Sequence, residues 1–123
     1  MVTAPELLEL VRSPYHVGTC SRADGQFSLS SRICGDRVTL SLRWDGDTVT
    51  ELWHAVQGCI ICQASASLLC RWAEGRDAAF LWNVANSQYL THFGTLSPFR
   101  QHCALLPLEC LRHLLARDDG AGQ

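Results

Sequence analysis

The chain has 123 residues, of which 47% are hydrophobic and 18% charged, and its formal net charge is −2. This length suits one domain with a substantial core and leaves no room for two. All ten cationic side chains are arginines, scattered singly, so the sequence lacks the basic stripe that nucleic-acid binding needs. The charged share is below the roughly 25% of ordinary domains, which suggests that partners cover part of the surface.

The sequence also bears on compartment and cysteine chemistry. No stretch approaches the ~20 apolar residues of a membrane span, and the N-terminus does not have the pattern of a signal peptide. We therefore expect a cytoplasmic protein with no membrane partner. Seven cysteines are a high and odd count, which in a reducing compartment favours metal or sulfur chemistry over a disulfide framework.

The first half of the chain predicts one helix followed by strands. Residues 4–12 have the spacing of a short amphipathic helix. Residues 27–44 alternate apolar and polar side chains, as half-buried strands do. Asp45-Gly46 supplies a hairpin turn, and residues 48–56 form the partner strand.

The second half predicts three helices. They span residues 59–74, 78–90 and 104–116. The last places Pro107 in its first turn, where proline is tolerated. We expect a single domain over residues 1–123, with a disordered tail at 117–123. The predicted strands precede most of the predicted helices along the chain. This order predicts an α+β fold, in which a small three-stranded antiparallel sheet is packed on one face by helices.

Three cysteines stand where a turn or a helix start determines the backbone. Cys34 lies in the sharp turn ICGDR, with Asp36 just after it. Cys59 stands at a helix start, where unpaired N–H groups and the positive end of the dipole stabilise a thiolate. Cys103 follows His102 just ahead of the last helix.

These junctions would form one site if they met at one end of the sheet. Three thiolates, a carboxylate and an imidazole suit a tetrahedral metal ion or an iron–sulfur cluster. On spacing alone, inert thiols that pack like small apolar residues are the competing interpretation. The CxxC of Cys59 and Cys62 is weak support for a redox site, because its middle is apolar and a thioredoxin-like βαβ context is absent.

Four stretches surround these cysteines: SPYHVG, ICGDRVTLSLRWDGDTV, GCIICQASASLL and SPFRQHCALLPLECLRHLL. In this order, and over nearly the whole chain, they resemble the IscU/NifU-type iron–sulfur cluster scaffold family. ICGD is similar to the first cysteine motif of that family, GCIICQASAS to the second and HCALL to the third. The resemblance implies the fold of the family's scaffold domain.

The resemblance also implies roles for individual residues. Cys34, Cys59 and Cys103 would be the cluster or metal ligands and the sulfur acceptors. Asp36 would be the neighbouring carboxylate that keeps a bound cluster transferable, and His102 a further ligand. Members of the family accept persulfide sulfur from a cysteine desulfurase, bind iron, build a [2Fe-2S] cluster and pass it to apo-proteins. Many are purified with zinc, and they act as scaffolds without turnover of their own.

Two other readings stay open. The zinc-dependent sulfurtransferase branch of the family, SufU, shares the ASAS motif of residues 64–67. It differs by an insertion before the third cysteine and by a lysine in place of the histidine that matches His102. The interval between Cys59 and Cys103 leaves no room for that insertion, which favours the scaffold branch. The alternative is a zinc-dependent sulfurtransferase that stimulates a cysteine desulfurase. A zinc-stabilised interaction module that has left the pathway is the third reading.

Some features depart from the family pattern. Residues 96–100, LSPFR, resemble a degraded form of the loop by which an Hsp70 chaperone grips scaffold members; Ser97, Phe99 and Arg100 are the departures. Cys62 stands where the family has a small residue, one helical turn after Cys59. It would be a spare sulfur carrier, an alternative ligand or a packing residue, and we favour packing. Whether clusters form within one protomer or in a homo-oligomer stays open.

The remaining cysteines are assigned to packing or to the surface. Cys70 and Cys110 fall inside predicted helices, so we expect both to be buried like small apolar residues. Cys20 lies in an early segment without a predicted element, and we expect it to be exposed and without a role.

Overall fold

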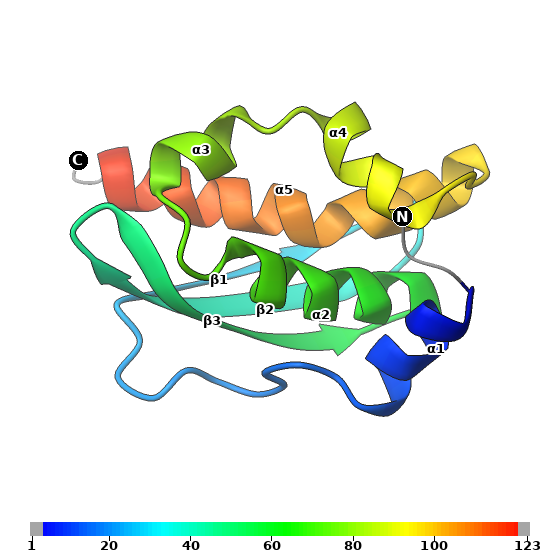
Figure 1. Ribbon diagram of the computed structural model, residues 1–123, viewed down its shortest axis with the longest axis horizontal. Coiled ribbons are helices and arrows are strands. Elements are labelled where there is room, and N and C mark those ends of the chain that lie inside the picture. The colour runs from blue at the N-terminus through cyan, green and yellow to red at the C-terminus, as the bar shows by residue number, and fades with distance from the viewer. Residues whose placement is uncertain (1–3, 121–123) are drawn as a thin grey trace.

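The computed structural model describes residues 4–120. Its elements in chain order are α1 (Ala4–Arg12), β1 (Gly25–Ser30), β2 (Arg37–Asp45), β3 (Thr48–Gln57), α2 (Ile60–Ala73), α3 (Ala78–Asn83), α4 (Asn86–Leu90), the 3-10 helix η1 (Thr91–Phe93) and α5 (Pro98–Gly120). The strands form one antiparallel sheet in the order β1-β2-β3, and helices pack on one of its faces (Figure 1). The predicted α+β fold is confirmed.

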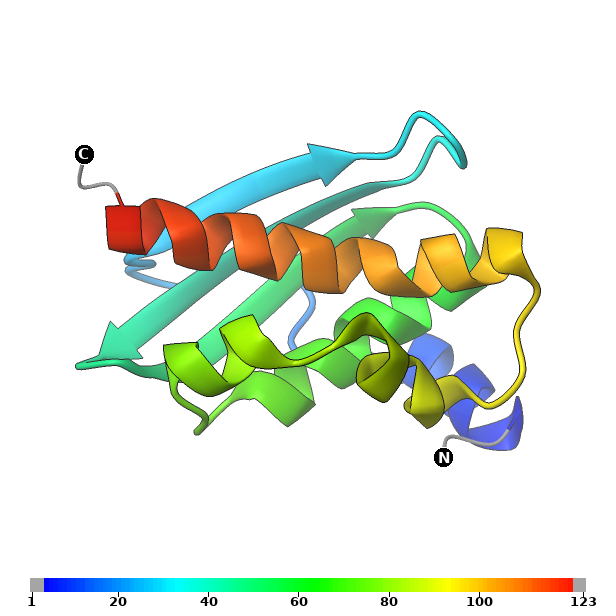
Figure 2. The same ribbon diagram turned by 90° about the horizontal axis from the view of Figure 1, so that it is seen from above.

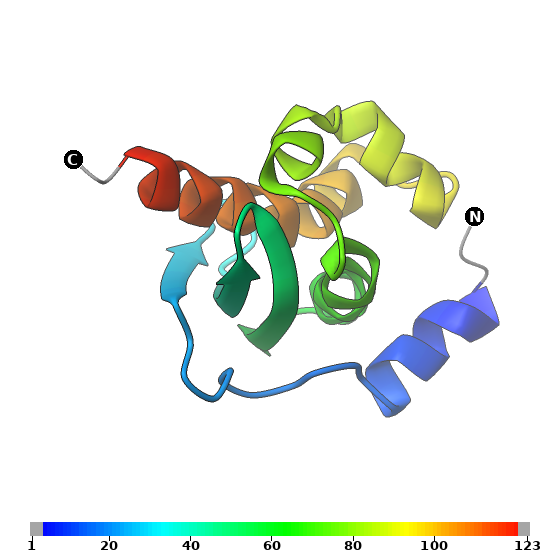
Figure 3. The ribbon, with the colours of Figure 1, turned by 60° about the vertical axis from the view of Figure 1, so that its left-hand side comes forward.

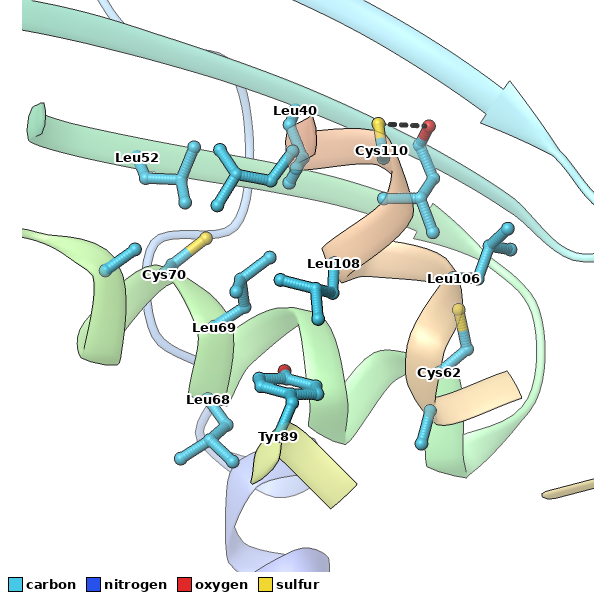
Figure 4. Packing of buried hydrophobic residues seen from close by; sticks show 14 of the residues in the cluster. Leu40, Leu52, Cys62, Leu68, Leu69, Cys70, Tyr89, Leu106, Leu108 and Cys110 are labelled. Atoms are coloured by element: carbon cyan, nitrogen blue, oxygen red, sulfur yellow. Dashed lines mark hydrogen bonds between the residues drawn. The ribbon is translucent and has the colours of Figure 1, made fainter. Parts of the chain in front are cut away.

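The middle strand carries the centre of the core. Val38, Leu40 and Leu42 of β2 are fully buried, because alternate side chains of a strand point to the same face. On that face α5 packs on β1 and β2, while α2 packs on β3 and against α5 (Figures 2 and 3). Leu69 of α2 and Leu108 of α5 fill the space between the two helices and the sheet (Figure 4).

The strand register brings distant parts of the chain to one end of the sheet. Ser30 pairs with Arg37, and Arg37 pairs with Gln57. The β1–β2 connection and the β3–α2 connection therefore leave the sheet side by side. The N-terminal end of α5 lies over this same end (Figure 2).

The segment between α1 and β1 corrects the expectation for Cys20. Residues 16–18 run along the edge of β3, where the His54 N–H donates to the carbonyl of His16 and the Gly18 N–H to the carbonyl of His54. Further on, the Cys20 N–H donates to Ser41 Oγ at 2.8 Å. Cys20 is consequently buried, with 3% exposure. The prediction of an exposed thiol was wrong, because contacts of a segment without regular structure leave no periodic signal.

The helix predicted over residues 78–90 is broken into α3 and α4. Val84, which ends α3, has an extended backbone, and the Ala85 N–H is taken by Gln88 Oε1 at 3.0 Å. From α5, Arg112 donates to the Val84 carbonyl and to Asn86 Oδ1. The break is thus held by a side chain far away in sequence, which local periodicity does not register.

The last helix begins six residues earlier than predicted and runs on to Gly120. Ser97 caps it by accepting the Arg100 N–H at 3.3 Å, and Pro98 occupies the first helical position, where its missing N–H is harmless. Pro107 therefore lies inside the helix and not in its first turn. The part of the predicted tail at 117–120 falls within α5, and 121–123 lie outside the described residues.

None of the helices in the described part of the chain combines the length and apolar character needed to span a bilayer.

Candidate metal and sulfur site

Cys34 is held in the β1–β2 connection by a serine three residues before it. Ser31 Oγ accepts the N–H of Ile33 at 3.1 Å and that of Cys34 at 3.2 Å. The Ser31 carbonyl accepts the Gly35 N–H, and Gly35 has a φ of 76°, a left-handed conformation that glycine adopts without strain. This compact turn presents Cys34 half-buried at the end of the sheet.

Cys59 is the N-cap residue of α2. Its Sγ accepts the Cys62 N–H at 3.4 Å, and its own N–H donates to Asp36 Oδ1 at 3.3 Å. Residue 58 must be glycine for this contact, because a Cβ there would lie 2.4 Å from the Cγ of Asp36. The first turn of α2 and the β1–β2 connection are therefore in direct contact, and Cys59 is exposed.

Cys103 lies in the second turn of α5 and not ahead of the helix as predicted. Its Sγ, the Cys34 Sγ and a carboxylate oxygen of Asp36 all lie within 4.8 Å of one another. Burial raises the pKa of the Cys103 thiol to about 12, and a hydrogen bond with Cys59 and the charges of Cys59 and Cys34 act in the same direction. Cys34 and Cys103 thus meet at Asp36, while Cys59 lies outside this group and adjoins it through Cys103 and Asp36.

The donor set fits a thiophilic divalent ion. Asp36 is 5% exposed, and its Oδ2 is buried without a hydrogen-bond partner among the described residues. A buried anionic oxygen is costly unless it is paired or bound to a cation. Two thiols beside a carboxylate oxygen of Asp36 suit zinc or iron, and metal binding releases the protons of thiol ligands.

His102 lies beside the site but outside the Cys34, Asp36 and Cys103 group. Its Nε2 is 2.7 Å from Ser31 Oγ. Since two backbone N–H groups already occupy the lone pairs of this oxygen, we assign the hydroxyl proton to the bond with Nε2, which makes the imidazole an acceptor there. In this arrangement His102 ties α5 to the Cys34 turn.

Cys62 has no exposed surface and points from α2 into the core (Figure 4). Burial raises the pKa of its thiol far above the ordinary value, and the charges of Asp36 and Cys59 raise it further. Cys62 therefore adjoins the site. Cys70, on the same helix, and Cys110 are also fully buried, as predicted. Cys110 donates to the Val38 carbonyl at 3.7 Å.

Two features of the site were not predicted from the sequence: the role of Ser31 in the turn of Cys34, and the contact with Asp36 that requires glycine at residue 58. A serine two and three residues before N–H groups that it can bind is the local signal of a serine turn, and SSRICG contains it. The requirement at residue 58 had no local signal, because it comes from a side chain in another connection.

Comparison with known proteins identifies the chain as a member of a scaffold-domain family. Residues 3–117 match the NifU-like N terminal domain, and the chain belongs to this family. The bifunctional protein NifU/MnmA of Rubrobacter xylanophilus is 29% identical over 109 residues, which cover 87% of this chain and 22% of that protein. The iron-sulfur cluster assembly scaffold protein IscU 1 of Archaeoglobus fulgidus is 22% identical over 85% of this chain and 68% of the relative.

Solved structures support the fold. The crystal structure of a nitrogen-fixing NifU-like protein (N-terminal) from Brucella abortus superposes with a TM-score of 0.77, covering 92% of this chain and 91% of that one at 21% identity. The resemblance to the IscU/NifU-type family that the cysteine motifs indicated is confirmed.

Proposed function

We propose that this protein is an iron–sulfur cluster assembly scaffold. It accepts persulfide sulfur from a cysteine desulfurase, binds iron and builds a transferable [2Fe-2S] cluster on Cys34, Cys59 and Cys103, which it passes to apo-proteins. The observation that carries the proposal is the approach of Cys34, Asp36 and Cys103 to within 4.8 Å. Membership of the NifU-like family supports the same assignment.

The site residues have distinct proposed tasks. Cys59 is the exposed thiol of the three, so we assign to it the first contact with incoming sulfur. Cys34 and Cys103 hold iron, with Asp36 as an oxygen ligand that keeps the cluster exchangeable. His102 serves as a further ligand only if its bond to Ser31 opens, and otherwise fixes the turn that carries Cys34. A reducing compartment such as the cytoplasm suits seven free cysteines.

The test is anaerobic reconstitution with ferrous iron, cysteine and a cysteine desulfurase. The expected result is visible charge-transfer absorption that moves to an apo-ferredoxin. Cys34→Ser, Cys59→Ser and Cys103→Ser should each abolish cluster formation. Cys70→Ala should not, because Cys70 is buried in the core about three helical turns after Cys59 (Figure 4). No cluster on the unaltered chain would refute the proposal.

The alternative, a zinc-dependent sulfurtransferase, has a different signature in the same assay. It would keep zinc bound, form no cluster, and raise the turnover of the desulfurase. If the protein binds zinc but neither forms a cluster nor stimulates the desulfurase, the remaining interpretation is a zinc-stabilised interaction module. For the chaperone, residues 96–100 offer little extended chain, because Pro98, Phe99 and Arg100 already form the first turn of α5; an Hsp70 would have to unwind that turn to bind it.

A further inference from the structure

Cys59 and Cys62 occupy the first turn of α2 in the arrangement of a redox dithiol. Cys59 caps the helix and is exposed, its Sγ accepts the Cys62 N–H at 3.4 Å, and Cys62 is fully buried. An accessible thiol at a helix N-terminus with a shielded partner three residues later is the geometry of reactive CxxC pairs. The sequence placed Cys59 at a helix start, but it did not show that Cys59 stays exposed while Cys62 is buried beside it.

We propose that Cys59 and Cys62 form a dithiol–disulfide couple that reduces a persulfide carried on Cys59 to sulfide. The inference rests on the proposed function for the source of that persulfide in the cell. It adds an activity to the scaffold, because the sulfur of an iron–sulfur cluster is sulfide, two electrons more reduced than the sulfane sulfur of a persulfide.

The surroundings of Cys59 suit the release of sulfide. Its N–H is bound by Asp36 Oδ1, while Oδ2 of the same carboxylate is buried without a partner among the described residues. A carboxylate oxygen of Asp36 lies within 4.8 Å of the sulfur atoms of Cys34 and Cys103. Sulfide expelled from Cys59 would therefore appear beside the atoms proposed to hold iron.

The step balances without an external oxidant. The Cys62 sulfur attacks Sγ of Cys59, a bond between the two sulfurs forms, and the bond from Sγ to the terminal sulfur breaks. The terminal sulfur leaves with the electron pair of the broken bond and its own proton, and with the proton of the Cys62 thiol it becomes hydrogen sulfide. The two cysteines end as a disulfide, which a dithiol reductant returns to the starting state.

The test uses the full chain, reduced and kept anaerobic, with one equivalent of glutathione persulfide as the sulfur donor. The wild-type chain should release sulfide and lose two hydrogens, with the disulfide mapped to Cys59 and Cys62 by mass spectrometry. Cys62→Ala should keep a persulfide on Cys59, be heavier by one sulfur atom and release sulfide on the order of tenfold more slowly. Cys70→Ala, which empties an equally buried position on the same helix, should behave as wild type.

Several outcomes would overturn the couple. These are equal rates of sulfide release by Cys62→Ala and wild type, a disulfide that maps to another pair of cysteines, or no release of sulfide by the wild-type chain. Cys62→Ser keeps a polar side chain of nearly the same volume as cysteine. Its rate of sulfide release must match that of Cys62→Ala, so that a packing defect is not mistaken for the loss of the thiol. Because no desulfurase is present, failure of a desulfurase to load the chain would refute the proposed function and leave this result standing.

Discussion

The carboxylate of Asp36 fills the space where a side chain on residue 58 would begin, since a Cβ there would lie 2.4 Å from its Cγ and 2.7 Å from its Cβ. Gly58 and Asp36 belong to different connections, and their contact joins the turn of Cys34 to the helix that Cys59 caps. The site is assembled by this close approach.

Gly58→Ala should therefore disturb both connections. The atoms nearest to the new methyl group are Cγ and Cβ of the short Asp36 side chain, which has little room to move. We therefore expect the free energy of unfolding to fall by about 1–3 kcal/mol. We also expect the protein to retain less metal. Urea unfolding and metal analysis measure the two effects. In an Asp36→Gly background, which removes the clashing atoms, the stability penalty of Gly58→Ala should shrink; an undiminished penalty would contradict the contact as its cause.

Ser31→Ala should loosen the turn that holds Cys34. The substitution removes the acceptor of two backbone N–H groups and the partner of His102, and we expect a loss of about 1–3 kcal/mol with weaker metal binding. Ser28→Ala is the matched control, because Ser28 Oγ makes a hydrogen bond of 2.7 Å to Thr39 Oγ1 within the sheet and not to the turn that carries Cys34. If Ser28→Ala weakens metal binding as much, Ser31 has no special role.

Asp36→Ala should slow the release of a cluster. A carboxylate oxygen is a more exchangeable partner for iron than a thiolate, so its removal should lower the rate of transfer to an apo-ferredoxin on the order of tenfold, while a cluster still forms. Asp24→Ala serves as the control, since Asp24 Oδ2 accepts the N–H of Trp44 at 2.8 Å near the other end of β2. Transfer at the wild-type rate would remove Asp36 from the mechanism.

His54 should make stability depend on pH. Burial lowers the pKa of this histidine below its ordinary value, and the neighbouring His16 acts in the same direction, against the hydrogen bond to the Tyr15 carbonyl. Its Nδ1 is buried without a partner among the described residues. Below that ordinary pKa the unfolded chain binds a proton that the folded chain does not, so stability should fall as pH falls.

Urea midpoints at about pH 7.5 and about pH 5.5 measure this difference, since the two values bracket the ordinary pKa of histidine. His54→Gln should reduce the drop between them. A residual drop is expected, because burial also lowers the pKa of His92. An unchanged drop in His54→Gln would show that His54 does not titrate as its surroundings imply.

The sequence alone determined the local elements and the chemistry available to the chain. Alternation in β2 and the Asp45-Gly46 turn predicted the sheet, because strand periodicity and positive φ are properties of neighbouring residues. The spacing of glycine and cysteine at Cys34 and Cys59 indicated a thiol site, and the motifs indicated the family.

Only the tertiary structure decided what depends on residues far apart in the chain. Arg112 breaks the helix predicted over 78–90, and residues 16–18 bury the segment of Cys20 by pairing with β3. Asp36 requires glycine at residue 58, and the packing of α2 against β3 and α5 buries Cys62. Each outcome rests on a contact between distant segments, and such a contact has no period and no fixed spacing along the chain.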